Sequence, residues 1–347
     1  MQYKLSQLVN YSNDKINSSL LTNLNYISTE NMLPNIGGII KSSNVPLNTN
    51  VCKFAKDNIL LSNIRPYFHK LYLATFTGGC SNDVLCFKIT NPKIINPRYL
   101  YYAMSTKSFI DYVVSTSKGT KMPRGDKNAI LEYSFNVASI PQQLLIVDII
   151  GSLDDKIENN NKIIDKLWQK LQLVHTDFKS KNELVEKNIL ELADIKYGRG
   201  IPTSEISKDG LYSVYGSNGI IGYLNNYTFQ EHKIAISCRG NSSGIIHLTD
   251  ENSTVTSNSL VLDFKNFDYT YYFFLEFMYK GLYEYKTGSA QPQITIDNLK
   301  ILNLQVPKNI NDYIKNINDS VEYTFCLKKE NQKLFLLKQF YLKKFFG

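Results

Sequence analysis

The chain repeats itself once, and this repeat constrains its fold more than any other feature. Each half opens with a lobe and closes with a long helical pattern that follows Ile140-Pro141 or Val306-Pro307. The lobes contain short runs of Val, Ile, Tyr, Phe and Thr between Gly and Asn turns, which predicts mixed α/β domains rich in sheet. The expected fold class is therefore α/β, with lobes at 1–140 and 184–306 and long helices at 141–183 and 307–347.

Paired landmarks occur in the same order in both lobes. They are an apolar strand, a Ser-Asn turn, an aromatic stretch and a Gly-Pro loop. The pairs are Asn58–Ser62 with Lys233–Ser237, Ser81–Val84 with Ser257–Leu260, Asn96–Tyr102 with Asn266–Tyr272, and Gly119–Pro123 with Gly288–Pro292. Because the order is kept, we expect the two lobes to share one fold.

The first helical pattern has an apolar seam with heptad spacing. The seam positions are Ile146, Ile150, Leu153, Ile157, Asn160, Ile164, Leu167, Leu171, Val174 and Phe178. A narrow seam of this length is typical of a helix that pairs with another helix. Asn160 is the one polar residue in it, and such a residue lowers stability but fixes register.

The second helical pattern carries a less regular seam. It starts with Ile310, Ile314, Ile317 and Val321 and resumes with Leu334, Leu337 and Tyr341. Lys328 and Asn331 interrupt it between these runs. We expect the two helices to pair with each other as an antiparallel coiled coil.

Charge and composition favour a polyanionic partner for the first lobe. The formal net charge is +8, and residues 1–140 carry 15 Lys and Arg against 7 Asp and Glu. Lys and Arg displace condensed counterions from nucleic-acid phosphates. Arginine is scarce, and its five residues (65, 98, 124, 199 and 239) all lie in the lobes. The second lobe is mildly acidic, so charge alone does not decide the partner.

The sequence begins without a signal-peptide pattern and holds no apolar run long enough to span a membrane. The five Cys form no CxxC pair and have no His partner at metal-ligand spacing, so we expect no metal site. A cytoplasmic protein with reduced thiols is the expectation.

Polar loops at matching places carry the candidate DNA contacts. Their Lys, Ser and Thr side chains suit phosphates, and their Arg and Gln side chains suit base edges. Arg65 and Arg239 each follow an apolar strand, and a further aromatic-flanked loop occurs at 212–219 in the second lobe only. The candidates are Arg65, Lys118, Gly119, Thr120, Lys121, Arg124, Tyr215, Ser217, Asn218, Arg239, Asn241, Thr287, Ser289, Gln291 and Gln293.

No catalytic constellation stands out from the sequence. It contains no Walker-type phosphate loop and no His-Glu-x-x-His motif. Asn96-Pro97-Arg98-Tyr99 superficially resembles the Asn-Pro-Pro-Tyr motif of DNA amino-methyltransferases, but Arg98 replaces the second Pro and no Gly-rich cofactor loop precedes it. We interpret this segment as a turn that starts a helix.

The chain resembles the specificity subunit of type I restriction-modification systems over nearly its whole length. The resemblance is sharpest at Ile140–Gln143 and Gly151–Asn160, and it extends to Gly200–Pro202, Val214–Gly222 and Tyr26–Asn31. The second helix departs from the family pattern around residues 324–333.

The resemblance implies two target recognition domains related by a pseudo-twofold axis and separated by the paired helices. It also implies a split, asymmetric double-stranded DNA site, two methyltransferase subunits as partners, and restriction subunits that can join. S-adenosylmethionine, ATP and Mg are then expected on those partner subunits, and this chain would be non-catalytic. A stand-alone DNA adenine methyltransferase and a coiled-coil adaptor that never meets DNA are the alternatives.

Overall fold

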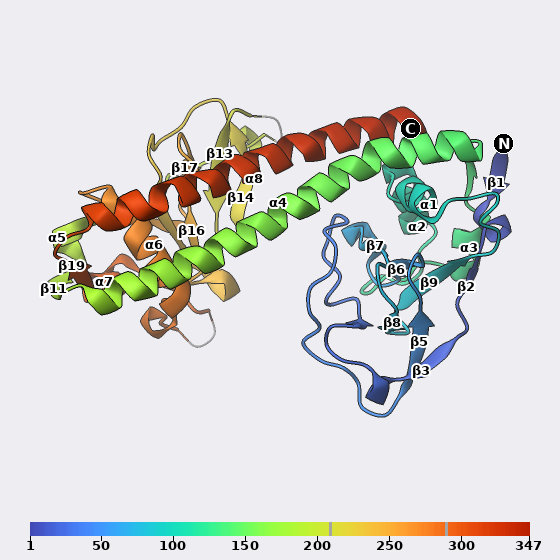
Figure 1. Cartoon of the computed structure of the whole chain (residues 1–347), viewed down its shortest axis with the longest axis horizontal. Coiled ribbons are helices and arrows are strands. Elements are labelled where there is room, and N and C mark those ends of the chain that lie inside the picture. The colour runs from blue at the N-terminus through green and yellow to red at the C-terminus, as the bar shows by residue number, and fades with distance from the viewer. Residues whose placement is uncertain (208–209, 289–290) are drawn as a thin grey trace. The chain divides into compact units, whose positions relative to one another are not determined.

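The computed structural model describes residues 1–207, 210–288 and 291–347. These residues form two compact units, one made of Met1–Asn159 with Asn331–Gly347 and the other of Asn160–Glu330. Two long helices, α4 (Ile140–Lys181) and α8 (Asn311–Phe346), contribute to both units and are the green and red helices of Figure 1. Each unit is described by itself below.

The first unit contains a central antiparallel sheet whose two inner strands, β6 (Ile59–Ser62) and β9 (Val84–Ile89), are largely buried on both faces. Its order is β2 (Val9–Tyr11), β9, β6 and β7 (Leu71–Leu73). Successive side chains of a strand point to opposite faces. Ile59 and Leu61 accordingly enter the core under the helices, whereas Leu60 enters a smaller core on the other face.

Further elements complete the first unit. A second sheet contains β3 (Lys15–Asn17), β5 (Asn50–Phe54), β8 (Gly78–Cys80) and β4 (Tyr26–Ile27), of which β4 and β8 are parallel. A two-stranded ribbon pairs β1 (Gln2–Lys4) with β10 (Ser134–Asn136). The helices are α1 (Pro97–Met104), α2 (Lys107–Ser115) and α3 (Lys127–Glu132).

The second unit repeats this plan. Its central sheet has the order β12 (Ala193–Tyr197), β18 (Ser259–Phe264), β15 (Ile234–Ser237) and β16 (Ile246–Leu248). Ile234 and Ile236 enter the large core and Ala235 enters a smaller one, as in the first unit. The halves therefore share one fold, as the internal repeat predicted.

The remaining elements of the second unit also have counterparts in the first. The second sheet holds β14 (Gly219–Leu224), β13 (Tyr212–Gly216) and β17 (Thr254–Val255), with β13 parallel to β17. The ribbon pairs β11 (Leu184–Asn188) with β19 (Asn303–Pro307). The short helices are α5 (Ile189–Leu192), α6 (Asp268–Lys280) and α7 (Ile296–Lys300).

The two long helices pair in antiparallel fashion in each unit. In the second unit, Lys170 Nζ donates to Ser320 Oγ at 3.4 Å and Asn160 Nδ2 donates to Glu330 Oε2 at 2.7 Å. In the first unit, Lys338 Nζ lies 2.6 Å from Asp154 Oδ1. The coiled-coil interpretation is confirmed.

The predicted seam of α4 is correct along its length. Ile146, Ile150, Asn160, Ile164 and Leu171 are buried. The other seam members from the sequence, Leu153, Ile157, Leu167, Val174 and Phe178, are half-buried. The buried Asn160 and its bond to Glu330 agree with a polar seam residue that fixes register.

The seam of α8 corrects one residue of the sequence analysis. Ile317 and Val321 are buried and Ile314 and Leu334 half-buried, as expected, but Leu337 is exposed. The neighbouring Lys338 and Leu342 are buried in its place. Lys338 can occupy this seam position because its ammonium pairs with Asp154. The apolar pattern of the sequence therefore placed the seam one residue too early, at Leu337.

Candidate nucleic-acid interface

In each lobe, loops that are distant in sequence meet at one edge of the central sheet. We call this surface the reading edge. It consists of the segment after β6 or β15, the turn before β9 or β18, the Gly loop and a hairpin tip. In the first lobe these are residues 63–69, 81–83, 118–124 and 34–37; in the second they are 238–243, 257–258, 287–288 with 291–293, and 217–218.

Backbone hydrogen bonds join these loops in the first lobe. Arg65 N–H donates to Pro123 O at 2.8 Å, which ties the strand end to the Gly loop. Asn63 N–H donates to Asp83 O at 2.8 Å. The hairpin tip is joined through Asn35 N–H, which donates to Phe68 O at 2.8 Å. Arg65 and the Gly loop are separate candidates in the sequence, and the fold places them side by side.

The second lobe repeats these contacts. Cys238 N–H donates to Asn258 O at 3.1 Å, and Ile294 N–H donates to Cys238 O at 3.0 Å. The hairpin tip is joined through Ser242 Oγ, which donates to Asn218 Oδ1.

The Gly loops have the same closure in both lobes. Lys118 and Arg124 exchange backbone hydrogen bonds of 2.8 and 2.9 Å, and Thr287 and Gln293 exchange two of 2.9 Å. The Gly that follows the first member of each pair has a positive φ, 93° at Gly119 and 86° at Gly288. Residues that carry a Cβ are strained at these φ angles, so the turn geometry requires Gly there.

The first Gly loop presents cations to solvent. Arg124 Nη2 pairs with Asp83 Oδ1 at 2.9 Å, and Lys118 Nζ pairs with Asp126 Oδ2 at 2.5 Å, which lowers the pKa of that carboxyl. Thr120 and Lys121 are exposed at the loop tip. These exposed ion pairs are weak and can exchange partners with a phosphate.

The structure corrects the pairing of the two strand-end arginines. Arg239 lies opposite Gln293 in the second lobe. In the first lobe the residue opposite Arg124 is Ile64, and Arg65 is the next residue along the chain. Arg65 therefore corresponds to Gly240, and both have a positive φ, 49° and 69°. The offset arises because Arg65 comes three residues after Ser62, whereas Arg239 comes two residues after Ser237, so that aligning the two arginines shifts the strands by one residue. Both arginines still lie on their reading edges.

Tyr215 was predicted as a DNA contact, and that prediction is wrong. Its side chain is buried against Phe229 and Val255 in the smaller core of the second lobe. The hydroxyl accepts from Asp250 N–H at 3.1 Å, and burial raises the pKa of the phenol. It supports the hairpin from inside instead of facing a ligand.

The other predicted contacts of the second lobe stay predictions. Asn218, Arg239, Thr287, Gln291 and Gln293 are exposed on the reading edge and Ser217 is half-buried there. Ser289 lies outside the described residues. Asn241 falls in a short 3-10 turn (Gly240–Ser242), and the structure describes its backbone only.

Sequence reasoning missed Arg199 as a site residue. Arg199 lies two residues after the end of β12, and its carbonyl accepts from Ser257 N–H at 3.0 Å, so it contacts the 257–258 turn of the reading edge. Gly198 permits this approach because a Cβ there would lie 2.4 Å from the carbonyl oxygens of Val255 and Thr256. The available signal was the scarcity of arginine, since Arg199 is one of five Arg residues in the chain.

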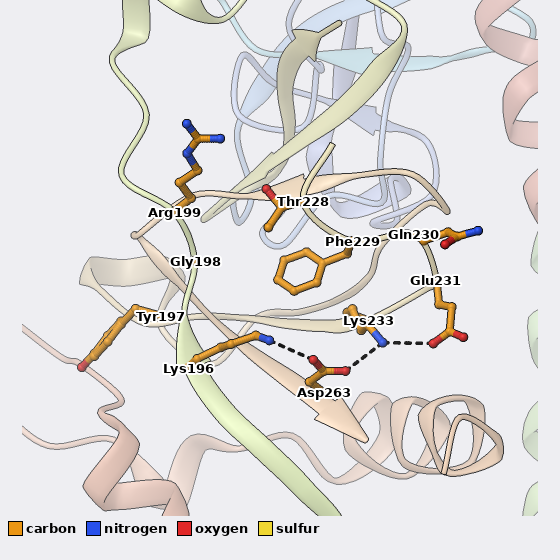
Figure 2. A pocket seen from close by; sticks show the side chains of 10 residues that line it. All are labelled: Lys196, Tyr197, Gly198, Arg199, Thr228, Phe229, Gln230, Glu231, Lys233 and Asp263. Carbon is orange, nitrogen blue, oxygen red and sulfur yellow. Dashed lines mark hydrogen bonds and ion pairs between the residues drawn. The ribbon is translucent and has the colours of Figure 1, made fainter. Parts of the chain in front are cut away.

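A pocket of about 520 Å³ opens beside Arg199. Asp263 lies between Lys196 and Lys233 at 2.8 Å from each ammonium, and Lys233 also pairs with Glu231 at 3.2 Å. Figure 2 shows the Arg199 side chain directed away from these ion pairs. The two lysines are therefore neutralised within the pocket, and Arg199 supplies the positive charge at its rim.

The segment that resembled a methyltransferase motif is a helix start, as interpreted from the sequence. Asn96 caps α1 by accepting from the N–H groups of Arg98 and Tyr99. Tyr99 is buried, and Arg98 binds Asp155 of α4 at 2.6 Å. These side chains join α1 to α4 and leave no aromatic free to stack on a base.

Among the described residues, no helix combines the length and the apolar character needed to cross a membrane. Within the same part of the chain, His, Cys, Asp and Glu side chains form no group of three or more that could hold a metal ion.

The fold defines a class of protein in which one α/β domain with a loop-bearing edge occurs twice, each copy followed by a long helix. The chain belongs to the type I restriction modification DNA specificity domain family, whose model matches residues 2–169 and again 181–338.

Two relatives illustrate this membership. The chain is 31% identical over 101 residues to the type I restriction enzyme EcoDI specificity subunit of Escherichia coli. This match spans 29% of the chain and only 22% of that relative. Among solved structures, the type I restriction-modification system S subunit from M. genitalium has a TM-score of 0.63 at 17% identity and covers 100% of this chain and 96% of its own. At that identity the likeness shows the shared fold.

Proposed function

We propose that this chain is the sequence-reading subunit of a type I restriction-modification complex and that each lobe reads a few base pairs through its reading edge. The observation that carries the proposal is the recurrence of the edge. The same loops meet at the same place in both lobes, while their exposed side chains differ. A shared scaffold with different contact residues is what a split, asymmetric site requires.

The residues of the edges suit the two kinds of DNA contact. Lys118 and Lys121 suit phosphates, which give affinity without sequence information. Arg124 and Arg239 suit guanine edges, and Gln291 and Gln293 suit adenine edges. Each good base contact discriminates by about 1–3 kcal/mol, so one small domain specifies only a few base pairs.

Two such domains gain specificity together if their spacing is fixed. Joined sites bind cooperatively only when the linker matches their separation. A paired-helix linker is stiff, and half-sites about one helical turn apart, ~34–36 Å, present the same face of the duplex. We propose that α4 and α8 set this spacing.

The chemistry of the complex is assigned to partner subunits. Two methyltransferase subunits would bind this chain and carry S-adenosylmethionine, and restriction subunits would carry ATP and Mg. This chain would bind DNA and its partners without catalysing a reaction. The helix-start role of Asn96–Tyr99 supports that division, because it removes the one segment that suggested methyl transfer.

Mapping methylated adenines across the genome, in cells with and without this gene, tests the proposal. We expect one split motif to lose methylation when the gene is absent. The alternatives have their own signatures. Tight S-adenosylmethionine binding by the isolated chain in calorimetry would indicate a stand-alone methyltransferase, and a complex with no preference among duplex sequences would indicate an adaptor.

Matched insertions test the spacer. Four residues added after Asn160 together with four added before Glu330 lengthen both helices by ~6 Å, at 1.5 Å per residue. We expect the mapped motif to keep both half-sites and to change the length between them. A motif with an unchanged spacer would refute the role of the helices.

A further inference from the structure

Two adjacent aromatic side chains stand exposed on the reading edge of the first lobe. Tyr67 and Phe68 belong to a 3-10 turn, η3 (Pro66–Phe68), directly after Arg65. They are 47% and 39% exposed, and their ring centroids lie 4.8 Å apart. Leaving two large rings in water forgoes the free energy that their burial would contribute.

The backbone holds this pair outward at a conformational cost. Arg65 and His69, which flank the turn, are both left-handed, with φ of 49° and 52°. The hairpin tip that braces them has left-handed φ at Asn35 and Ile36, 54° and 58°. Such angles are unfavourable for residues other than Gly, above all for a β-branched one like Ile36.

The bracing is specific. Asn35 N–H donates to Phe68 O and Ile36 N–H donates to His69 O, both at 2.8 Å. Arg65 is in turn bonded to Pro123 of the Gly loop. The aromatic pair is therefore fixed relative to Arg65 and to the cations of that loop.

The second lobe has no such pair at this position. Its equivalent segment is Gly240–Ser242, a turn of small and polar residues. The two reading edges thus share their scaffold and differ in chemistry at one defined place.

We propose that Tyr67 and Phe68 contact thymine methyl groups in the half-site bound by the first lobe. This inference rests on the proposed DNA-reading function. In the major groove the C5-methyl group of thymine is the apolar feature that distinguishes base pairs, and apolar side chains contact it. Arg65 and Arg124 beside the rings suit guanine in the same groove.

The experiment uses the full chain in complex with its methyltransferase partner and duplexes that carry the mapped motif. The first-lobe half-site is the one whose sequence preference weakens with Lys121→Ala and Arg124→Ala. Each thymine of that half-site is replaced in turn by deoxyuridine, which removes the methyl group and keeps the hydrogen-bonding edges. For at least one position we expect affinity to fall about fourfold, the equivalent of one buried methyl group.

The variants decide which residues sense the methyl group. Tyr67→Ala with Phe68→Ala should bind thymine and deoxyuridine duplexes equally, and the single Tyr67→Ala, at the more exposed ring, should lose part of the discrimination. Leu24→Ala is the matched control. Leu24 is 70% exposed and lies before the start of β4. Because β4 runs parallel to β8, Leu24 lies at the opposite end of these strands from the reading-edge turn 81–83, which follows β8. It should keep the full effect.

The outcomes separate this inference from the function on which it rests. A complex with no sequence preference would overturn both. A complex with a clear preference but no response to deoxyuridine, or an aromatic double variant that keeps the wild-type response, would overturn this inference alone. A rise in 2-aminopurine fluorescence that depends on Tyr67 would also overturn it, since the rings would then unstack bases instead of contacting methyl groups.

Discussion

The buried carboxylate of Glu276 offers a quantitative test of how the second unit is stabilised. Glu276 lies on α6, and its side chain is 10% exposed. Its Oε2 lies 2.9 Å from His175 Nε2 and 2.7 Å from Lys179 Nζ, and its Oε1 lies 2.8 Å from Lys280 Nζ. His175 Nδ1 is within 2.8 Å of the Tyr313 hydroxyl, so the network joins α4, α6 and α8.

Glu276→Gln removes the charge and keeps the shape of the side chain. Removing one member of a buried ion pair destabilises by about 3–5 kcal/mol. The Gln oxygen can still accept hydrogen bonds and Lys280 is largely exposed, so we expect a loss near the lower bound, about 3 kcal/mol at pH 7. Urea denaturation followed by Trp168 fluorescence measures it, because Trp168 packs on Phe274 of α6 with ring centroids 5.6 Å apart.

The pH dependence follows from the pKa of the same carboxyl. Burial raises this pKa, but the hydrogen bonds from His175, Lys179 and Lys280 outweigh burial and hold it below the ordinary 4.5. A folded-state pKa below the unfolded one contributes stability that is present above pH 4.5 and is lost as the pH falls. The difference between wild type and variant should therefore shrink from pH 7 to pH 4 by up to about 0.8 kcal/mol, the limit for a folded-state pKa well below 4.

Asp165→Asn on an exposed position of α4 is the control and should change the unfolding free energy by less than about 0.5 kcal/mol. A difference between wild type and Glu276→Gln that stays constant from pH 7 to pH 4 would refute the reasoning, because the charge would then not be the source of the stability. The absence of any difference at pH 7 would refute it as well.

The remaining predictions concern the reading edge and the helix seam. Lys121→Ala with Arg124→Ala should weaken DNA binding and lower the slope of log affinity against log salt by up to about 2, with little change in melting temperature; an equal loss of folding would assign the loop a structural role. Leu342→Ala should lower the free energy of unfolding by about 2–5 kcal/mol and Leu337→Ala by less than about 0.5, as measured by denaturation. The reverse order would mean that Leu337, as the sequence predicted, is the seam residue. Tyr215→Phe should lower stability by about 1 kcal/mol through the lost bond to Asp250, and binding assays should find its DNA affinity unchanged at a temperature where it is folded; a selective loss of affinity would return Tyr215 to the interface.

The sequence alone was sufficient for the features that depend on local pattern and repetition. Heptad spacing predicted α4 and its seam, including the buried Asn160, because periodic burial leaves a periodic record in one chain. The ordered landmarks predicted one fold for both lobes. The polar loops at matching places made Arg65, Arg239 and the Gly loops candidates, and the structure brings them onto one edge in each lobe.

Only the tertiary structure decided which residues share a surface. Arg199, the hairpin tip at Asn35 and the aromatic pair of η3 join the reading edge through backbone hydrogen bonds between distant segments, which no local pattern records. Tyr215 looked like a loop aromatic and is buried because the fold packs Phe229 and Val255 against it. The register of α8 depended on an ion pair between Lys338 and Asp154, since a charged side chain can hold a seam position only when a partner on the other helix compensates it.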